Sequence, residues 1–399
     1  MKTCIEEFAI LGGFVAFAEK LHVGCPNIGN REHLQERINE ILDRRWLTNN
    51  GVFVQEFEQR IAEFLHVKHC IVVCNATVGL EIAIHASGMQ GEVIVPSFTF
   101  IGTVHALQWG GITPVFSDID PFTHNLDPKQ VERMITPRTT GIIGVHLWGR
   151  VCVVETLTEI AQNNDLKLLF DAAHAFGCSY NGVMIGNFGN AEVFSFHATK
   201  FFNTFEGGAV VTNDDELAKK VRLMKNFGFC GNVISIGTNG KMSEVSAAMG
   251  LTGLDSLDEL ITINYRNYQQ YQRELTTIPG IYLARYKETE KCNYQYIVLE
   301  IDEMETQLSR DQLMQILLAE NVQARRYFYP GCHRMEPYHS HFPHAGLLLP
   351  ETEKLTQRIL VLPTGTAISS DDITIICQII QLAVKHGREI NSRIPRFAT

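Results

Sequence analysis

The sequence lacks the glycine-rich loops with which many nucleotide-binding proteins hold phosphate groups. None of its 31 glycines lies two residues from another glycine, so the G-x-G-x-x-G fingerprint of dinucleotide-binding domains cannot occur. A G-x-x-x-x-G-K-[ST] phosphate loop is also absent, as is the G-x-S-x-G nucleophile motif. These absences argue against a Rossmann dehydrogenase, a P-loop nucleotide hydrolase and an α/β-hydrolase.

Paired cysteines and long apolar runs are absent too. The ten cysteines form no C-x-x-C pair, which leaves zinc ribbons and thioredoxin-like redox sites without support, and Cys70 and Cys74 lie in an apolar stretch. No stretch approaches the roughly 18 apolar residues of a membrane span. The apolar segment 8–17 follows Glu6 and Glu7, where a signal peptide has a basic flank. We therefore expect a cytoplasmic protein with free thiols and no membrane span.

An excess of positive charge and a metal-binding pattern are missing as well. Lys and Arg number 34 against 44 Asp and Glu, which gives a formal net charge of −10. A nucleic-acid-binding protein shows a basic footprint, so we expect no nucleic-acid partner. The histidines of segment 333–344 are not spaced as zinc ligands on a helix, and Pro337 and Pro343 indicate a loop, so we expect no metal site.

Short apolar strands that alternate with helices dominate the middle of the chain. Strands are predicted at 70–76, 92–97, 113–119, 140–148, 166–173, 192–199 and 207–213, with helices between them at 77–87, 101–109, 128–135, 153–163 and 215–226. Two more helices are predicted within 30–66, on either side of the polar loop 46–51. This alternation is typical of an α/β fold with a mostly parallel central sheet covered on both faces.

The pattern changes beyond about residue 255. Here the sequence predicts an amphipathic helix at 257–275, a strand at 294–301, and helices at 310–319, 350–358 and 370–386. We therefore predict a large α/β domain at residues 1–255, which includes the N-terminal helical segment, and a smaller α+β domain at 256–399.

Two charged residues stand where predicted strands end. Asp171 closes the strand of LLFDAAHAFG, and Lys200 follows the strand of FSFHATK. Ligands of parallel sheets gather at these strand ends. A partly buried lysine has a lowered pKa and can attack a carbonyl carbon, and a carboxylate can pair with the protonated ring nitrogen of pyridoxal phosphate (PLP). The alternative is that Asp171 caps a turn and Lys200 is a solvated surface residue.

A phosphate site is predicted where a strand passes into a helix. Ala76 and Thr77 open that helix, whose free N–H groups and dipole favour a phosphate, and Ser195 adds a hydroxyl five residues before Lys200. The aromatic residues of PSFTF at 96–100 suit a planar ring. The alternatives are an ordinary helix cap at Thr77 and a buried strand end at 96–100.

The motifs NATVGL, PSFTF, FDAAHAFG, FSFHATK, GTNGKMSE and RRYFYPGCH, taken in this order, resemble those of the DegT/DnrJ/EryC1/StrS family of PLP-dependent sugar aminotransferases. The resemblance covers about residues 46–365 and implies the type I PLP-dependent transferase fold, that of the aspartate aminotransferase superfamily. It implies that Lys200 is the catalytic lysine that carries the cofactor covalently and shuttles the proton. It implies these other cofactor contacts: Asp171 at the pyridine nitrogen, His174 near the phenolic oxygen, Phe100 on the ring face, and Ala76, Thr77 and Ser195 at the phosphate.

Further roles follow from the resemblance alone. Asn239 in GTNGKMSE matches an asparagine that reaches the phosphate of the neighbouring subunit, which implies a homodimer with shared active sites. Two residues depart from the family pattern, since Phe201 stands where Asn is usual and Phe205 where Gly is frequent, and both make the loop after Lys200 more apolar. The resemblance implies substrate contacts by Lys241, Tyr327, His333 and Asn50.

The implied activity is transfer of an amino group from an amino acid, expected to be L-glutamate, to a nucleotide-linked keto sugar. The segments RRYFYPGCH, WLTNNG and GTNGKMSE are most similar to those of members that act on C4 of dTDP-4-keto-6-deoxyglucose. A nucleoside diphosphate brings two negative charges, for which four basic residues are available: Arg325, Arg326, Arg334 and Lys241.

Three alternatives stay open. The first is amination at C3 on the same scaffold, because residue spacing does not fix how the sugar is oriented. The second is a PLP-dependent sugar dehydratase, but such family members carry His where this chain has Lys200. The third is a non-catalytic regulatory or binding protein, against which the intact lysine, aspartate and phosphate site argue.

Overall fold

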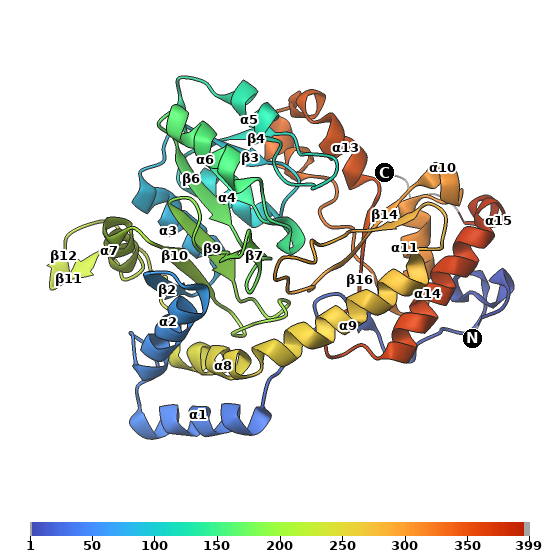
Figure 1. Ribbon diagram of the computed structural model, residues 1–399, viewed down its shortest axis with the longest axis horizontal. Coiled ribbons are helices and arrows are strands. Elements are labelled where there is room, and N and C mark those ends of the chain that lie inside the picture. The colour runs from blue at the N-terminus through green and yellow to red at the C-terminus, as the bar shows by residue number, and fades with distance from the viewer. Residues whose placement is uncertain (1, 395–399) are drawn as a thin grey trace.

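A seven-stranded sheet forms the centre of the computed structural model, which describes residues 2–394 (Figure 1). Every neighbouring pair in the sheet is parallel except the two pairs that involve β10. The α/β class and the mostly parallel sheet predicted from the sequence are therefore confirmed. In spatial order the strands are β2 (His69–Val73), β10 (Gly208–Thr212), β9 (Ala191–Ser195), β6 (Lys167–Asp171), β5 (Thr139–Val145), β3 (Glu92–Pro96) and β4 (Thr113–Ser117).

Both faces of this sheet are covered by helices, which explains why its strands read as continuous apolar runs. Alternate residues of a strand enter different cores: Ile71 and Val73 pack with the helices of one face, and Cys70 and Val72 with those of the other. The first face is covered by α3 (Ala76–Ser87), α4 (Ile101–Trp109) and α7 (Asp215–Met224), and the second by α5 (Pro128–Met134), α6 (Val154–Asn163), α2 (Val52–Leu65) and α8 (Glu244–Asp255).

The C-terminal part is built on a three-stranded antiparallel sheet and long helices. The amphipathic helix α9 (Leu257–Leu275) leads from α8 into this part, with the bounds that the sequence predicted (Figure 1). The sheet contains β13 (Ile281–Leu283), β14 (Ile297–Ile301) and β16 (Ile359–Leu362), covered by α11 (Arg310–Ala319) and α14 (Ser370–Lys385). The predicted boundary at residues 255 and 256 falls between α8 and α9 and stays a prediction.

The N-terminal segment packs against C-terminal elements. Phe8 and Phe17 are buried in the same core as α9, α11 and α14, and β1 (Leu21–His22) pairs in parallel with β15 (Val322–Gln323). The buried Glu320 carboxylate accepts the backbone N–H groups of Ala9 and Ala16 at 2.8 Å each. The sequence prediction grouped this segment with residues 1–255, because an apolar stretch does not reveal which distant element it contacts.

The remaining elements are short or peripheral. The predicted helices on either side of loop 46–51 are α1 (Arg31–Arg44) and α2. None of the helices within residues 2–394 is both long enough and apolar enough to cross a membrane. The other elements are β7 (Ser179–Tyr180), β8 (Val183–Met184), β11 (Phe229–Cys230), β12 (Asn232–Val233), α10 (Glu303–Thr306), α12 (Tyr338–His341), α13 (Pro350–Thr356) and α15 (Gly387–Arg393).

Candidate active site

A cavity of about 620 Å³ lies at the carboxyl ends of the parallel strands. The turns after β2, β3, β6 and β9 and the last residue of β5, Val145, contribute to its lining, since these strands end at the same edge of the sheet. The structure brings together eight of the residues predicted from the sequence, which line this cavity: Ala76, Thr77, Phe100, Asp171, His174, Ser195, Lys200 and Tyr327.

Lys200 lies in a tight turn after β9, where its backbone N–H donates to the carbonyl of His197 at 2.9 Å. Its Nζ donates to the hydroxyl of Tyr296 at 3.1 Å. Burial lowers the pKa of Lys200 to about 8, against the opposing charges of Asp171 and Tyr327. About a tenth of this amine is therefore neutral and nucleophilic at pH 7, several hundred times the fraction of an unshifted lysine.

Asp171 is the last residue of β6 and is buried, with 6% of its surface exposed. Its Oδ2 accepts the Thr103 hydroxyl at 2.7 Å, and its Oδ1 accepts the Ala173 backbone N–H at 3.0 Å. Burial raises the pKa of Asp171, and these two hydrogen bonds oppose that rise. An ionised carboxylate in such a place is stabilised when a ligand cation pairs with it.

His174 is held in one orientation and one tautomer. Its Nδ1 accepts the Trp148 backbone N–H at 3.1 Å, so a neutral ring carries its proton on Nε2. Burial lowers the pKa of His174 well below its usual value, and the charge of Lys200 lowers it further, which keeps the ring neutral. The ring stacks on Phe328 with an interplanar angle of 10°, and it is therefore placed to donate one hydrogen bond to a ligand.

The start of α3 offers backbone N–H groups that suit an anion. The Asn75 side chain caps the helix by accepting the Val78 N–H at 2.9 Å, and the N–H groups of Ala76 and Thr77 are the first two of the helix. A Cβ on Gly208 of β10 would lie 2.9 Å from the Ala76 nitrogen, so only glycine leaves this approach open. Ser195, at the end of β9, lines the same cavity as Ala76 and Thr77.

Phe100 presents an aromatic face to the cavity. It stands immediately before α4 and is 60% exposed, which is unusual for a large apolar side chain beside a buried sheet. Together these groups fit a planar ligand with an anionic end, an aromatic ring and a carbonyl carbon for Lys200 to attack.

Four predicted site residues lie outside this cavity. His333 is 1% exposed, and its two ring nitrogens contact Ser97 Oγ and Glu353 Oε1 at 2.6 Å each. Both nitrogens therefore already have hydrogen-bond partners within the protein. Asn50, Asn239 and Lys241 lie on two loops that meet where the Glu244 N–H donates to the Leu47 carbonyl at 3.0 Å. No group of three or more His, Cys, Asp and Glu suited to a metal is found among residues 2–394.

Two important contacts were not predicted. Thr103 binds Asp171 from the first turn of α4, and its position four residues after Thr99 in a helical pattern offered a signal for it. Tyr296 contacts Lys200 across 96 residues of sequence from the C-terminal part, and nothing in the local pattern indicates that pairing.

Comparison with known proteins gives one family. The model of the DegT/DnrJ/EryC1/StrS aminotransferase family matches residues 29–381. The chain is 37% identical to dTDP-4-amino-4,6-dideoxy-D-glucose transaminase of Shigella dysenteriae, over 90% of this chain and 98% of that protein. It is 34% identical to GDP-perosamine synthase of Caulobacter vibrioides, over 89% and 95% of the two chains. Among solved structures it is similar to DesI, determined in the presence of its TDP-sugar product, with 50% identity, a TM-score of 0.94, and coverage of 98% of this chain and 99% of that one.

Proposed function

The chain belongs to the DegT/DnrJ/EryC1/StrS aminotransferase family, and from that membership we propose that it transfers an amino group from L-glutamate to C4 of a dTDP-linked 4-keto-6-deoxyglucose, with PLP as cofactor. The observation that carries the proposal is that Lys200, Asp171 and the N-terminus of α3 line one cavity. These three groups suit the aldehyde, the ring nitrogen and the phosphate of PLP, in that order. The similarity to the dTDP-4-amino-4,6-dideoxy-D-glucose transaminase of Shigella dysenteriae, and to DesI, which was determined in the presence of its TDP-sugar product, supports the choice of sugar.

The residues present fit PLP in charge and in shape. The N-terminus of α3 and Ser195 suit its phosphate, and the buried Asp171 carboxylate suits a protonated ring nitrogen. The exposed face of Phe100 suits the ring, and the Nε2 proton of His174 suits an oxygen acceptor beside it. When bound, the cofactor supplies an electron sink for the carbon that loses its proton.

The chain's own residues do the rest of the work. Lys200 would hold the cofactor, then act as the base that removes a proton from the α-carbon of the amino donor and the acid that returns it to the carbon two bonds away, since its lowered pKa lets it change charge near neutral pH. Tyr296 orients the Lys200 amine through their hydrogen bond. Asp171, fixed by Thr103 and Ala173, keeps the ring nitrogen protonated throughout.

The pKa of Lys200 predicts how fast apoenzyme captures added PLP. A protonated amine cannot attack the aldehyde, so below pH 8 the capture rate should rise about tenfold per pH unit and then level off. An unshifted lysine, with a pKa of 10.5, would give a rate that still rises beyond pH 10. Stopped-flow absorbance between pH 6 and pH 11 measures this, with Lys200→Ala apoenzyme as the control. A rate that climbs steadily to the highest pH contradicts the lowered pKa.

Contacts within the chain narrow the choice of groups for the sugar nucleotide. Arg326 already pairs with Asp311 and Arg334 with Glu353, whereas Arg325 and Lys241 have no carboxylate within 4 Å among the described residues. Tyr327 lines the cavity. We therefore assign Arg325 and Lys241 to the diphosphate and Tyr327 to the sugar.

A panel of 3-keto and 4-keto sugar nucleotides with dTDP, UDP and GDP tests the substrate. With glutamate as donor, we expect the dTDP-linked 4-keto-6-deoxyglucose to give the highest kcat/KM and a product aminated at C4, identified by mass spectrometry and NMR. Turnover of 3-keto sugars alone overturns the C4 assignment and favours the C3 alternative. Loss of the C3 or C4 hydroxyl without incorporation of nitrogen favours the dehydratase. Absence of turnover with every donor favours the non-catalytic alternative.

We also propose that two copies share their active sites. The segment 227–236 around β11 and β12 exposes Phe229, Ile234 and Ile236, the last to 93%, and loop 46–51 exposes Trp46. Apolar side chains gathered this way on a surface mark an interface. The loop that carries Asn239 adjoins both segments and lies outside the cavity of its own chain, which suits a contribution to the partner's phosphate site.

Mixing two inactive variants tests this sharing directly. In a mixed dimer one chain carries Lys200→Ala and the other carries Asn239→Ala. If Asn239 serves the partner's site, both changes then fall in the same active site, and the second active site keeps its Lys200 and its Asn239. Refolding the two variants together in equal amounts should then restore about a quarter of the unmodified activity, since half of the dimers are mixed and each has one working site. If Asn239 serves its own chain, mixing restores nothing above the residual activity of Asn239→Ala. Sedimentation of the unmodified protein as an active monomer also contradicts the proposal.

A further inference from the structure

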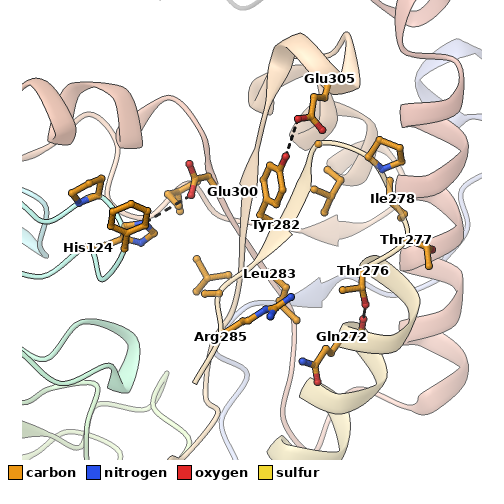
Figure 2. Close-up of a pocket in the computed structure, with 18 of the residues that line it drawn as sticks. His124, Gln272, Thr276, Thr277, Ile278, Tyr282, Leu283, Arg285, Glu300 and Glu305 are labelled. Carbon is orange, nitrogen blue, oxygen red and sulfur yellow. Dashed lines mark hydrogen bonds and ion pairs between the residues drawn. The ribbon is translucent and has the colours of Figure 1, made fainter. Parts of the chain in front are cut away.

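A second cavity of about 620 Å³ lies away from the candidate active site, between the loop after β4 and the sheet of the C-terminal part (Figure 2). Its walls come from segment 121–124, the end of α9, strands β13 and β14, and the turn after β5. No residue lines both cavities. Trp148, Tyr296 and Val298 pack in one apolar cluster, and this cluster separates the two spaces.

Two arginines of this cavity have no acidic partner. Arg150 is partly buried, and its Nη2 donates to the Phe122 carbonyl at 2.6 Å. Burial lowers the pKa of Arg150, and the charges of Asp120 and Glu300 oppose that shift. Arg285 lies on the exposed rim, and neither guanidinium has a carboxylate within 4 Å among residues 2–394. A partly buried guanidinium of this kind is stabilised when an anion pairs with it.

The acidic residues of the cavity are already engaged. Glu300 forms an ion pair with Arg358 at 3.2 Å. Glu305 accepts a hydrogen bond from the Tyr282 hydroxyl at 2.9 Å (Figure 2). The cavity therefore offers positive charge that its own carboxylates do not neutralise.

A buried histidine also lines this space. His124 is 5% exposed, and its Nδ1, which has no hydrogen-bond partner, is shielded from solvent. Its Nε2 lies 3.8 Å from Glu300 Oε2 (Figure 2). Burial and the charge of Arg150 lower the pKa of His124 to about 3, so the ring is neutral and adds no positive charge to the cavity. Figure 2 shows its ring at one side of the cavity, opposite Gln272 and Thr276 at the end of α9.

Much of the remaining lining is apolar, with Ile278, Leu283, Val298 and Ile359 on its walls, and Gln272, Thr276 and Thr277 add polar groups at the end of α9. A cavity of this volume with apolar walls and a few placed polar groups is typical of small-molecule sites. We propose that it binds a small organic carboxylate, which pairs with Arg150 near the rim residue Arg285 and lays an apolar body against Leu283 and Ile278.

Benzoate is a suitable probe, with benzamide as its uncharged counterpart. Ligand-observed NMR titration of the full-length holoenzyme should give saturable benzoate binding at millimolar concentrations, and binding of benzamide at least tenfold weaker. Arg150→Gln should weaken benzoate binding about tenfold, a change of about 1.4 kcal/mol. Leu283→Trp, which fills the cavity without altering charge, should abolish it. Arg273→Gln, an exposed arginine of α9 outside the lining, is the matched control and should change nothing.

Three results each overturn the proposal. The first is equal binding of benzoate and benzamide, which shows that the guanidinium groups do not select an anion. The second is benzoate affinity unchanged in Leu283→Trp, and the third is no saturable binding to the unmodified holoenzyme. Arg285→Gln serves where Arg150→Gln fails to fold, since Arg285 is exposed and its side chain makes no hydrogen bond or ion pair within the described residues. The affinity of this variant for benzoate should fall, and an unchanged value counts against the proposal.

Discussion

Lys200→Ala is expected to lower kcat for transamination by about 10⁴-fold or more, because it removes the group that both holds the cofactor and moves the proton. The borohydride-reducible link between protein and cofactor should vanish with it. Folding should be unaffected, since the Lys200 amine makes one hydrogen bond, to Tyr296, and its removal relieves a buried charge. Steady-state kinetics, borohydride trapping followed by peptide mass spectrometry, and thermal unfolding measure these three effects.

The matched control for this variant is Lys219→Ala. Lys219 lies on α7, is exposed, and pairs only with Glu216 three residues away. Its removal should leave kcat and the covalent link unchanged, because exposed ion pairs contribute little. Activity of Lys200→Ala within tenfold of the unmodified enzyme, or a reducible link at another lysine, is incompatible with the assigned role.

Asp171→Asn is expected to lower kcat by about 10²–10⁴-fold, since an amide cannot keep a ring nitrogen protonated. The change preserves shape, and the amide oxygen can still accept from Thr103 or Ala173. PLP should therefore still bind, with an altered absorbance spectrum and with little loss of stability. Measuring kcat, the PLP dissociation constant and the spectrum separates loss of chemistry from loss of binding.

Asp165→Asn tests the same substitution on the same segment. Asp165 is exposed in the turn that precedes β6, at the opposite end of the strand from Asp171. Its kcat should equal that of the unmodified enzyme. If Asp171→Asn retains kcat and loses only cofactor affinity, then Asp171 serves to bind the ring and the proposed electrostatic role is wrong.

The part of the molecule that depends on local pattern was predictable from the sequence. Apolar strands alternating with amphipathic helices identified all seven strands of the central sheet, and the period of three to four residues gave α9 with its observed ends. The sequence also predicted that Asp171 and Lys200 lie close together, because parallel strands end at one edge of a sheet, and both residues line one cavity. The family inferred from the ordered motifs is confirmed by the match over residues 29–381.

The part that depends on distant contacts was not. Tyr296 reaches Lys200 only because β14 lies beside the large sheet, and no spacing in the sequence encodes that approach. The ring of His333 is held by Ser97 and Glu353 inside the protein, and its predicted contact with substrate stays a prediction. The contribution of Asn239 to a partner stays a prediction, since it concerns a surface that one chain does not complete.

The docking of the N-terminal segment on the C-terminal core also determines the order of folding steps during synthesis. The Ala9 N–H and its acceptor Glu320 are 311 residues apart, so the segment leaves the ribosome long before its binding surface exists. At about 5–20 residues per second, that interval is roughly 15–60 s. Throughout it Phe8 and Phe17, which are buried in the finished protein, remain open to chaperones or to other nascent chains. A fusion partner placed ahead of residue 1 would therefore affect the docking of this segment on the C-terminal core. That docking is the last step in the folding of the C-terminal half, although the fusion is attached at the other end of the chain.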